Sequence, residues 1–231
     1  IISNNQSVLH VLEVYQLNKL LLANGGDLFL DIVPLFETID DLAAAHSVMS
    51  SLYNNKTYRD HLRKRGNKQS IMLGFSDGTK DGGYIRANWS ILRAKEELTK
   101  VAREEGIDVV FFDGRGGPPA RGGGNTHNFY ASLGPNVENR EIQITIQGQT
   151  ISANYGKPVS CSYNLEQLLS AGMESHLYPS SENSLTDKQK SLIDEMADIS
   201  YNAYKELKNH EQFVPYLEKV TPLKFFGMTN I

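Results

Sequence analysis

Apolar and polar positions change their spacing along the chain, and the changes predict helices and strands in turn. Apolar residues at helical spacing predict helices over residues 7–23, 40–53, 57–64 and 84–105. Thr38, with Asp41 three residues on, is placed to cap the second of these helices. Short apolar or alternating runs predict strands over residues 28–36, 70–75, 108–112 and 141–151. The strands recur at intervals of roughly 35 to 40 residues with helices between them, which is typical of parallel βα units. The pattern therefore predicts an α/β fold.

The C-terminal part of the chain has a helical pattern from residue 165 to residue 217. Thr186 is placed to cap a helix that begins at Asp187. The buried side of this helix is predicted to comprise Leu192, Ile193, Met196, Ile199, Tyr201 and Tyr204. Residues 216–231 are predicted to be irregular. The glycine-rich segment 78–83 is predicted to be a turn that leads into the long helix 84–105, whose inward side begins at Ile85.

Composition narrows the class of protein. The 231 residues carry a net charge of −4 and an ordinary globular mixture, so we treat residues 1–231 as a single domain. The mild acidity argues against nucleic-acid and membrane-surface binding. No apolar run reaches the ~20 residues that span a bilayer. The single cysteine, Cys161, fits a reducing cytoplasm and excludes an internal disulfide.

Carboxylates follow the first two predicted strands. Glu37 comes directly after the first, and Asp77 follows the second. Because the carboxyl ends of parallel strands meet at one edge, we expect the two side chains to lie on one face. Two carboxylates could hold a hard cation such as Mg²⁺ or Mn²⁺, which keeps waters and takes further oxygens from substrate.

Basic residues surround the same predicted face. Lys80 lies three residues after Asp77, and the third strand runs into the segment 113–124, DGRGGPPARGGG, which carries Arg115 and Arg121. Arginine and lysine suit a phosphate or carboxylate, and glycines let backbone N–H groups approach an anion. The segment does not match a nucleotide-binding phosphate loop. We therefore predict a site for a phosphate or carboxylate group, and the sequence does not indicate a nucleotide.

Each of these signals has a structural alternative when it stands alone. A carboxylate at a strand end is often a helix cap or an ion-pair partner, and Asp77 could simply make a turn. Lys80 could be a solvated surface residue. His127, beside the glycine-rich segment, could cap or pack as readily as catalyse. The conjunction of complementary charges at three strand ends favours a binding site.

Five segments carry a resemblance to a known family. They are PLFETIDDL (34–42), MLGFSDGTKDGG (72–83), ANWSILRAKEELTKVAREEGI (87–107), FFDGRGGPPARGGGNTH (111–127) and IQITIQGQTISANYG (142–156). In this order they resemble phosphoenolpyruvate carboxylase across essentially the whole chain. The resemblance implies a partial TIM-type (β/α) barrel with additional α-helices. It also implies that the chain is a central-to-C-terminal piece of a longer cytoplasmic enzyme.

The resemblance implies a reaction and a set of residue roles. The family converts phosphoenolpyruvate and bicarbonate to oxaloacetate and phosphate with Mg²⁺ or Mn²⁺. Metal binding falls to Glu37 and Asp77. The implied catalytic residues are Lys80, Arg115 and Arg121. The implied substrate-binding residues are Asp113, Arg115, Gly116, Gly117 and Arg121. Arg121 is also implied in binding an inhibitory dicarboxylate, aspartate or malate.

Two departures from the family pattern concern the site. Many members have histidine where this chain has Asp113, so we expect Asp113 either to pair with Arg115 or to face away from the substrate. The segment SDGTKDGG replaces the more usual SDSxKDAG, which should only loosen a turn.

The resemblance leaves three functional hypotheses. The first is a part of the carboxylase that is inactive alone, because the family's catalytic histidine lies in an N-terminal half outside this chain. We expect homo-oligomers of the full-length enzyme and self-association of the isolated chain. The second is a non-catalytic module whose glycine-rich segment senses dicarboxylate or phosphate. The third is a different phosphate-binding barrel enzyme.

Overall fold

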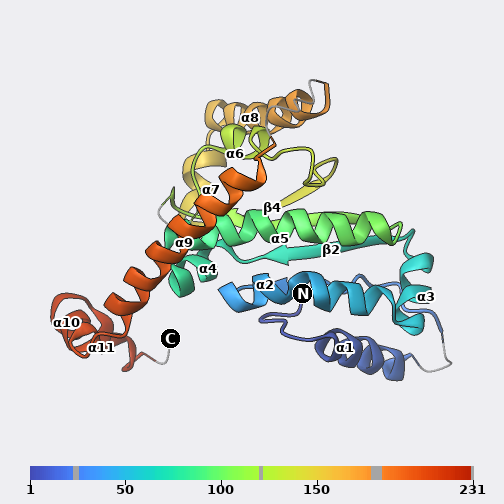
Figure 1. The fold of residues 1–231 in the computed structure, drawn as a ribbon, viewed down its shortest axis with the longest axis horizontal. Helices are drawn as coiled ribbons and strands as arrows, with labels where there is room; N and C mark the ends of the chain where they lie inside the picture. Colours follow the sequence, from blue (N-terminus) through green and yellow to red (C-terminus); the bar gives the residue numbers. More distant parts are fainter. Residues whose placement is uncertain (23–25, 120–121, 178–183, 230–231) are drawn as a thin grey trace.

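The computed structural model describes residues 1–22, 26–119, 122–177 and 184–229 (Figure 1). The elements in chain order are α1 (Val8–Leu21), β1 (Leu35–Phe36), α2 (Ile39–Tyr53), α3 (Lys56–Lys64), β2 (Lys68–Leu73), α4 (Phe75–Gly82), α5 (Tyr84–Glu104), β3 (Asp108–Gly116), α6 (Thr126–Ala131), β4 (Ile142–Ile146), α7 (Gly148–Tyr155), α8 (Pro158–Leu177), α9 (Asp187–Lys208), α10 (Phe213–Val220) and α11 (Leu223–Phe226). In the described part of the chain, no helix is both long and apolar enough to cross a membrane.

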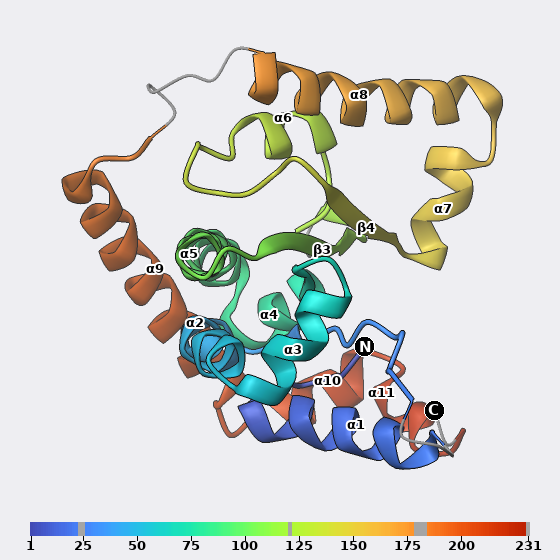
Figure 2. The same ribbon diagram turned by 90° about the vertical axis from the view of Figure 1, so that its right-hand side faces the viewer.

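The strands form one parallel sheet in the order β1-β2-β3-β4. Ile71 of β2 is in register with Phe111 of β3, and Phe111 is in register with Ile142 of β4. Helices connect successive strands (Figure 2). The predicted helix-rich α/β fold is confirmed, and sequential parallel strands with helical connections are consistent with part of a (β/α) barrel.

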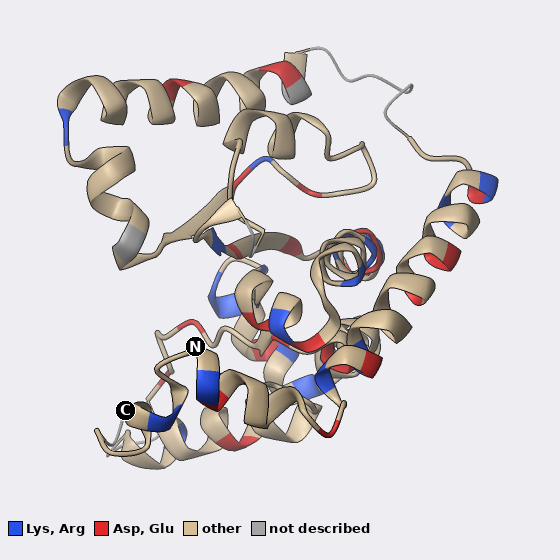
Figure 3. Ribbon diagram, turned by 90° about the vertical axis from the view of Figure 1, so that its left-hand side faces the viewer, with Lys and Arg blue, Asp and Glu red and all other residues tan. Residues whose placement is uncertain are grey.

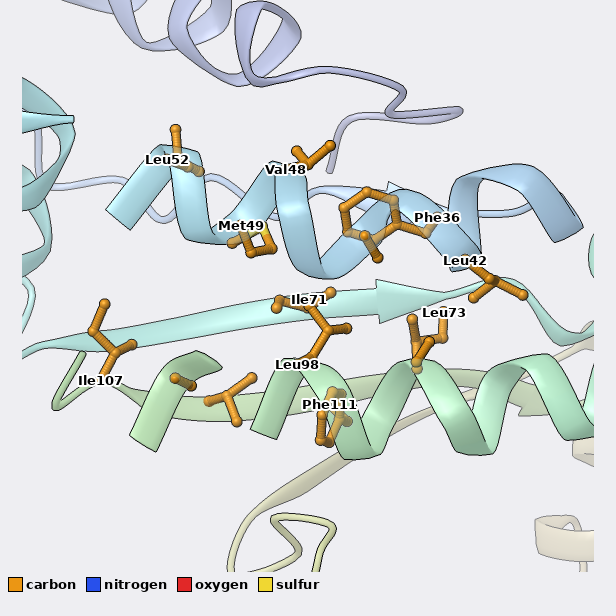
Figure 4. Close-up of a cluster of buried hydrophobic side chains, with 14 of the residues drawn as sticks. Phe36, Leu42, Val48, Met49, Leu52, Ile71, Leu73, Leu98, Ile107 and Phe111 are labelled. Carbon is orange, nitrogen blue, oxygen red and sulfur yellow. The ribbon is translucent and has the colours of Figure 1, made fainter. Parts of the chain in front are cut away.

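The core lies between the sheet and helices α2 and α5, which pack against each other. Figure 4 shows Met49 of α2, Ile71 of β2 and Leu98 of α5 in one apolar cluster, and each is almost completely buried. Leu42 and Leu73 extend the cluster toward the carboxyl end of the strands. This packing holds the strand ends, and therefore the candidate site, on a rigid base.

Helix α2 begins as the sequence predicts. The hydroxyl of Thr38 accepts a hydrogen bond from the N–H of Asp41 at 3.1 Å, and the Asp41 carboxylate accepts one from the N–H of Thr38 at 3.1 Å. This capping box satisfies two N–H groups that have no partner within the helix. A carboxylate from α4, that of Asp81, accepts from the N–H of Ile39 at 3.0 Å. The start of α2 is therefore tied to α4.

The prediction of a turn over residues 78–83 is wrong, because residues 75–82 form helix α4. The N–H of Gly78 donates to the carbonyl of Gly74 at 3.0 Å, and the N–H of Gly83 donates to that of Thr79 at 3.0 Å. Glycine is needed at the last position, since a Cβ on Gly82 would lie 2.5 Å from the side chain of Ile39. Close packing on α2 thus overrides the weak helical propensity of this segment.

Two predicted strands are shorter in the structure. Only Leu35–Phe36 of the run 28–36 joins the sheet, and Pro34 forms an isolated bridge with Ile2. Pro34 also lacks an N–H to donate to a ladder. The strand predicted over 141–151 ends at Ile146, and α7 follows.

The C-terminal helices also differ from the predictions. Leu192, Met196 and Ile199 of α9 are more than half exposed, and Ala197 is its fully buried residue. On α5, Ile85 is exposed too. Residues 213–226, mostly predicted irregular, contain α10 and α11. Helix α9 crosses the outer side of α4 and α5 (Figure 1). These two helices cover only a small part of the surface of α9, so most of its apolar residues stay exposed.

Candidate metal and anion site at the strand ends

Glu37 lies between β1 and α2, where the chain leaves the sheet. Its Oε1 accepts a hydrogen bond from the N–H of Asn4 at 3.0 Å. The backbone at the start of α4 packs directly against it, since a Cβ on Gly74 would lie 3.1 Å from the Glu37 Cα and 3.2 Å from its Cγ. Gly74 also donates from its N–H to the carbonyl of Phe36 at 2.9 Å. The first carboxylate is therefore held beside the helix that carries the second.

Asp77 and Lys80 lie on α4 and pair with each other. The Lys80 Nζ donates to the Asp77 Oδ1 at 2.7 Å, and the two side chains are 60% and 48% exposed. An exposed ion pair of this kind contributes at most about 1 kcal/mol. Breaking this ion pair so that Asp77 or Lys80 can bind a ligand therefore costs little free energy.

Glu37 and Asp77 are the carboxylates predicted to hold a hard cation. No group of three or more His, Cys, Asp or Glu side chains suited to a metal occurs among the described residues. A zinc-type cage is thus not formed by that part of the chain. Mg²⁺ and similar hard cations bind through one or two carboxylates, waters and substrate phosphate oxygens. The donor set agrees with the prediction of Mg²⁺ or Mn²⁺, which stays a prediction.

Helix α9 supports the end of α4, a feature that the sequence analysis missed. The Tyr204 hydroxyl donates to the carbonyl of Lys80 at 2.7 Å, and the Lys208 Nζ donates to the same oxygen at 3.1 Å. Gly83, with φ of 78°, lies against the Tyr204 ring, which a Cβ would approach to 3.1 Å. These contacts span more than 120 residues, so no local pattern could have indicated them.

Arg115 lies at the end of β3 and is 7% exposed. Its guanidinium carbon lies 4.1 Å from the centre of the Phe129 ring, and its Nη2 donates to the carbonyl of Asn125 at 3.2 Å. Burial lowers the pKa of Arg115 from its ordinary value, and the nearby Asp113 carboxylate opposes that effect. The side chain is thus held in place by the segment around α6.

Asp113 is completely buried and forms its ion pair with Lys95, not with Arg115, within the described part of the chain. Lys95 Nζ and the Tyr130 hydroxyl each donate to Asp113 Oδ2 at 2.8 Å. Of the two expected outcomes, pairing with Arg115 is therefore wrong. The side chain faces away from solvent, toward α5 and α6, so its role in substrate binding stays a prediction.

Lys95 is the partner that the sequence analysis missed. It lies on α5 and is 1% exposed. Burial lowers the pKa of Lys95, while the Asp113 carboxylate raises it again. A signal was present in the helical period, because Lys95 lies four residues after Ile91 and three before Leu98, both buried. A lysine on the apolar side of a helix indicates a buried counter-ion.

The glycines of the segment 113–124 are required by close approach of the chain to itself. A Cβ on Gly116 would lie 1.8 Å from the carbonyl oxygen of Thr145 in β4, and one on Gly123 would lie 1.9 Å from the carbonyl oxygen of Gly117. Arg121 lies outside the described residues, so its predicted roles stay predictions.

Charge around the site is mixed in sign. Figure 3 shows acidic and basic positions interspersed along the helices of the chain. His127 Nε2 lies 3.2 Å from Glu174 Oε2, which links α6 to α8. The capping, packing and catalytic alternatives for His127 stay predictions.

The fold and the site define an α/β protein that carries carboxylates and an arginine at the carboxyl ends of parallel strands, where such sheets bind ligands. The sequence profile of the family described as phosphoenolpyruvate carboxylase matches residues 1–231. The chain belongs to the phosphoenolpyruvate carboxylase family.

Individual relatives agree with this assignment. The chain is 39% identical over 239 aligned positions to phosphoenolpyruvate carboxylase of Corynebacterium glutamicum, covering 100% of this chain and 26% of the relative. It is 41% identical over 239 positions to that of Mycobacterium leprae, covering 100% and 25%. It is 40% identical over 197 positions to that of Rhodothermus marinus, covering 84% and 21%. The chain thus spans about a quarter of the length of these relatives.

Proposed function

We propose that this chain is the part of a phosphoenolpyruvate carboxylase that supplies metal-binding carboxylates and phosphate-binding cations. The complete enzyme would convert phosphoenolpyruvate and bicarbonate to oxaloacetate and phosphate. One observation carries the proposal: the start of α4, the helix that carries Asp77 and Lys80 after β2, packs against Glu37 at the end of the neighbouring strand β1. Family membership over residues 1–231 supports the reaction.

In this proposal the acidic residues bind the metal ion and the basic residues bind the substrate. Glu37 and Asp77 would hold Mg²⁺ or Mn²⁺, which when bound neutralises negative charge on the phosphate and the enolate oxygen. Lys80 would leave its exposed pair with Asp77 and bind substrate oxygen. Arg115 would grip the phosphate, since its Nε has no hydrogen-bond partner among the described residues. Phosphoryl transfer depends mostly on such positioning and charge neutralisation.

The glycine-rich segment would exclude water from the site. Gly122 and Gly124, with φ of 85° and 105°, adopt backbone conformations that other residues rarely take. Exclusion of water matters because the enolate must react with carbon dioxide before it takes a proton. Arg121, within this segment, would stabilise the transferring phosphoryl group and bind the dicarboxylate inhibitor.

The proposal is tested by calorimetric titration of phosphoenolpyruvate into this chain with Mn²⁺. We expect Mn²⁺-dependent binding that Asp77→Asn abolishes. Asp60→Asn is a matched control, because Asp60 forms an equally exposed ion pair with Arg63 three residues along α3 at 2.8 Å. Binding that Asp77→Asn leaves intact, or no binding by the folded chain, would refute the proposed site.

A second measurement concerns turnover. We propose that the 231-residue chain binds substrate without making oxaloacetate, since it corresponds to about a quarter of its relatives. A coupled assay that follows oxaloacetate reduction checks this expectation. Metal-dependent turnover by the chain alone would contradict it.

A further inference from the structure

A buried charged cluster lies behind the candidate site. Asp113 is 0% exposed and Lys95 is 1% exposed, and their side chains meet at 2.8 Å. Tyr130 donates a second hydrogen bond to the same carboxylate oxygen at 2.8 Å. A buried ion pair is a poor source of net stability, because removing two charges from water costs nearly as much as their attraction returns. Its presence beside a site therefore calls for a functional reason.

Aromatic rings enclose the cation of this pair. The Lys95 Nζ lies 5.0 Å from the centre of the Phe111 ring, 5.5 Å from that of Phe129 and 5.8 Å from that of Tyr130. The Phe129 ring also contacts Arg115, whose guanidinium carbon lies 4.1 Å from the ring centre. One anion thus lies near two cations, and a single aromatic ring contacts both of them.

The hydrogen bonds show which of the two cations, Lys95 or Arg115, pairs with Asp113. Lys95 takes Oδ2 of Asp113, while Oδ1 of Asp113 and Nε of Arg115 are buried and have no partner among the described residues. The Asp113 charge nevertheless acts on Arg115, since it raises the pKa of that guanidinium against the effect of burial. Without Lys95, the carboxylate would have Arg115 as its nearest source of positive charge within the described cluster.

We infer that Lys95 is a positioning residue for substrate binding: its ammonium neutralises Asp113 and so keeps the charge of Arg115 free for an anionic ligand. The inference rests on the proposed role of Arg115. It explains how a carboxylate is tolerated two residues before a phosphate-binding arginine, because the pair Asp113–Lys95 has no net charge. Arg115 then presents an uncompensated positive charge, as phosphate recognition requires.

Three variants separate charge balance from packing. Lys95→Gln leaves Asp113 without its cation, Asp113→Asn removes the anion, and the double variant Lys95→Gln/Asp113→Asn removes both charges. The first readout is the affinity for phosphoenolpyruvate with Mn²⁺. The second needs no ligand: it is the Nε–H resonance of Arg115 in the NMR spectrum, assigned by its loss in Arg115→Lys.

The expected pattern is asymmetric. Lys95→Gln should weaken binding by about tenfold or more and shift the Arg115 resonance, because the guanidinium turns to Asp113. Asp113→Asn and the double variant, in which no unpaired Asp113 charge remains, should both bind more tightly than Lys95→Gln and retain the parent resonance. A role in packing alone would instead make the double variant at least as weak as Lys95→Gln.

Each outcome decides the inference. An unshifted Arg115 resonance in Lys95→Gln, or a double variant as impaired as the single one, overturns it. If Lys95→Gln does not fold, the double variant alone tests the inference. A folded double variant with the parent Arg115 resonance supports charge balance. A folded double variant with a displaced Arg115 resonance refutes it. If the parent chain binds no phosphoenolpyruvate, the proposed function fails at this site, while the resonances still test the inference.

Discussion

The substitution Gly116→Ala tests why glycine follows Arg115. Gly116 is the last residue of β3 and is in register with Ile146 of β4. An added Cβ would lie 1.8 Å from the carbonyl oxygen of Thr145 and 2.5 Å from the Ile146 Cα. Both contacts are with backbone, so no side-chain rotation relieves them. Either β4 or the end of β3 must move.

The size of the effect follows from this geometry. Separations below 3.0 Å do not occur for real Cβ atoms, so the strands must part locally by at least about 1.2 Å. Overpacking of this kind costs about 1–3 kcal/mol. The shift would also disturb two hydrogen bonds to the Gly116 carbonyl, from the Gln147 N–H at 2.9 Å and the Thr150 hydroxyl at 2.6 Å, each contributing about 1 kcal/mol. We expect a total loss of about 3–5 kcal/mol.

The assay is urea unfolding and thermal unfolding of the parent and the variant, each monitored by circular dichroism. A loss of about 3 kcal/mol corresponds to a melting temperature lower by roughly 6–12 °C in a chain of this size. Gly148→Ala is the matched control, because a Cβ there meets nothing within 4 Å at the first residue of α7. Gly148→Ala should be neutral or stabilising. A Gly116→Ala variant within about 0.5 kcal/mol of the parent would refute the packing argument.

Three further outcomes follow from single contacts. Thr38→Ala removes the hydroxyl that accepts from the Asp41 N–H, and should lower the free energy of unfolding by about 1 kcal/mol in urea titration. Tyr204→Phe removes the donor to the Lys80 carbonyl, and should speed amide exchange at the C-terminal end of α4 with a loss below about 1.5 kcal/mol. Burial lowers the pKa of His61, so below its ordinary value of about 6.5 the unfolded chain takes up a proton that the folded chain resists. The free energy of unfolding should therefore fall as the pH falls from 7.5 to 5, and this slope should flatten in His61→Asn; an equal slope in both proteins would contradict the reasoning.

Features with a local cause could be predicted from the sequence. The capping box of Thr38 and Asp41 needs only residues three positions apart, and the structure confirms it. Helix α5 follows its apolar period from Tyr84 to Glu104, within one residue of the prediction. The segment 75–82 could not be predicted in this way, because glycine favours turns locally. In the structure this segment is a helix whose Gly82 packs against Ile39, a contact that is distant in sequence.

The same distinction applies to the apolar side of α9. Leu192, Met196 and Ile199 share the spacing of a buried face, yet each is more than half exposed. A helical period states which side of a helix is apolar, whereas burial depends on what packs there. The period alone therefore predicts the helix but not its environment.

The candidate site shows where this limit affects function. The sequence identifies charged residues at strand ends, since strand order and residue type are enough to bring Glu37 and Asp77 to one edge. It does not identify how charges compensate one another, because the partner of Asp113 is a lysine 18 residues away on a different element. A carboxylate beside Arg115 would weaken phosphate binding, whereas a carboxylate neutralised by Lys95 leaves the arginine free. If Arg115 binds phosphate as proposed, the net charge of the buried cluster, rather than the presence of Asp113, would decide whether the site binds an anion.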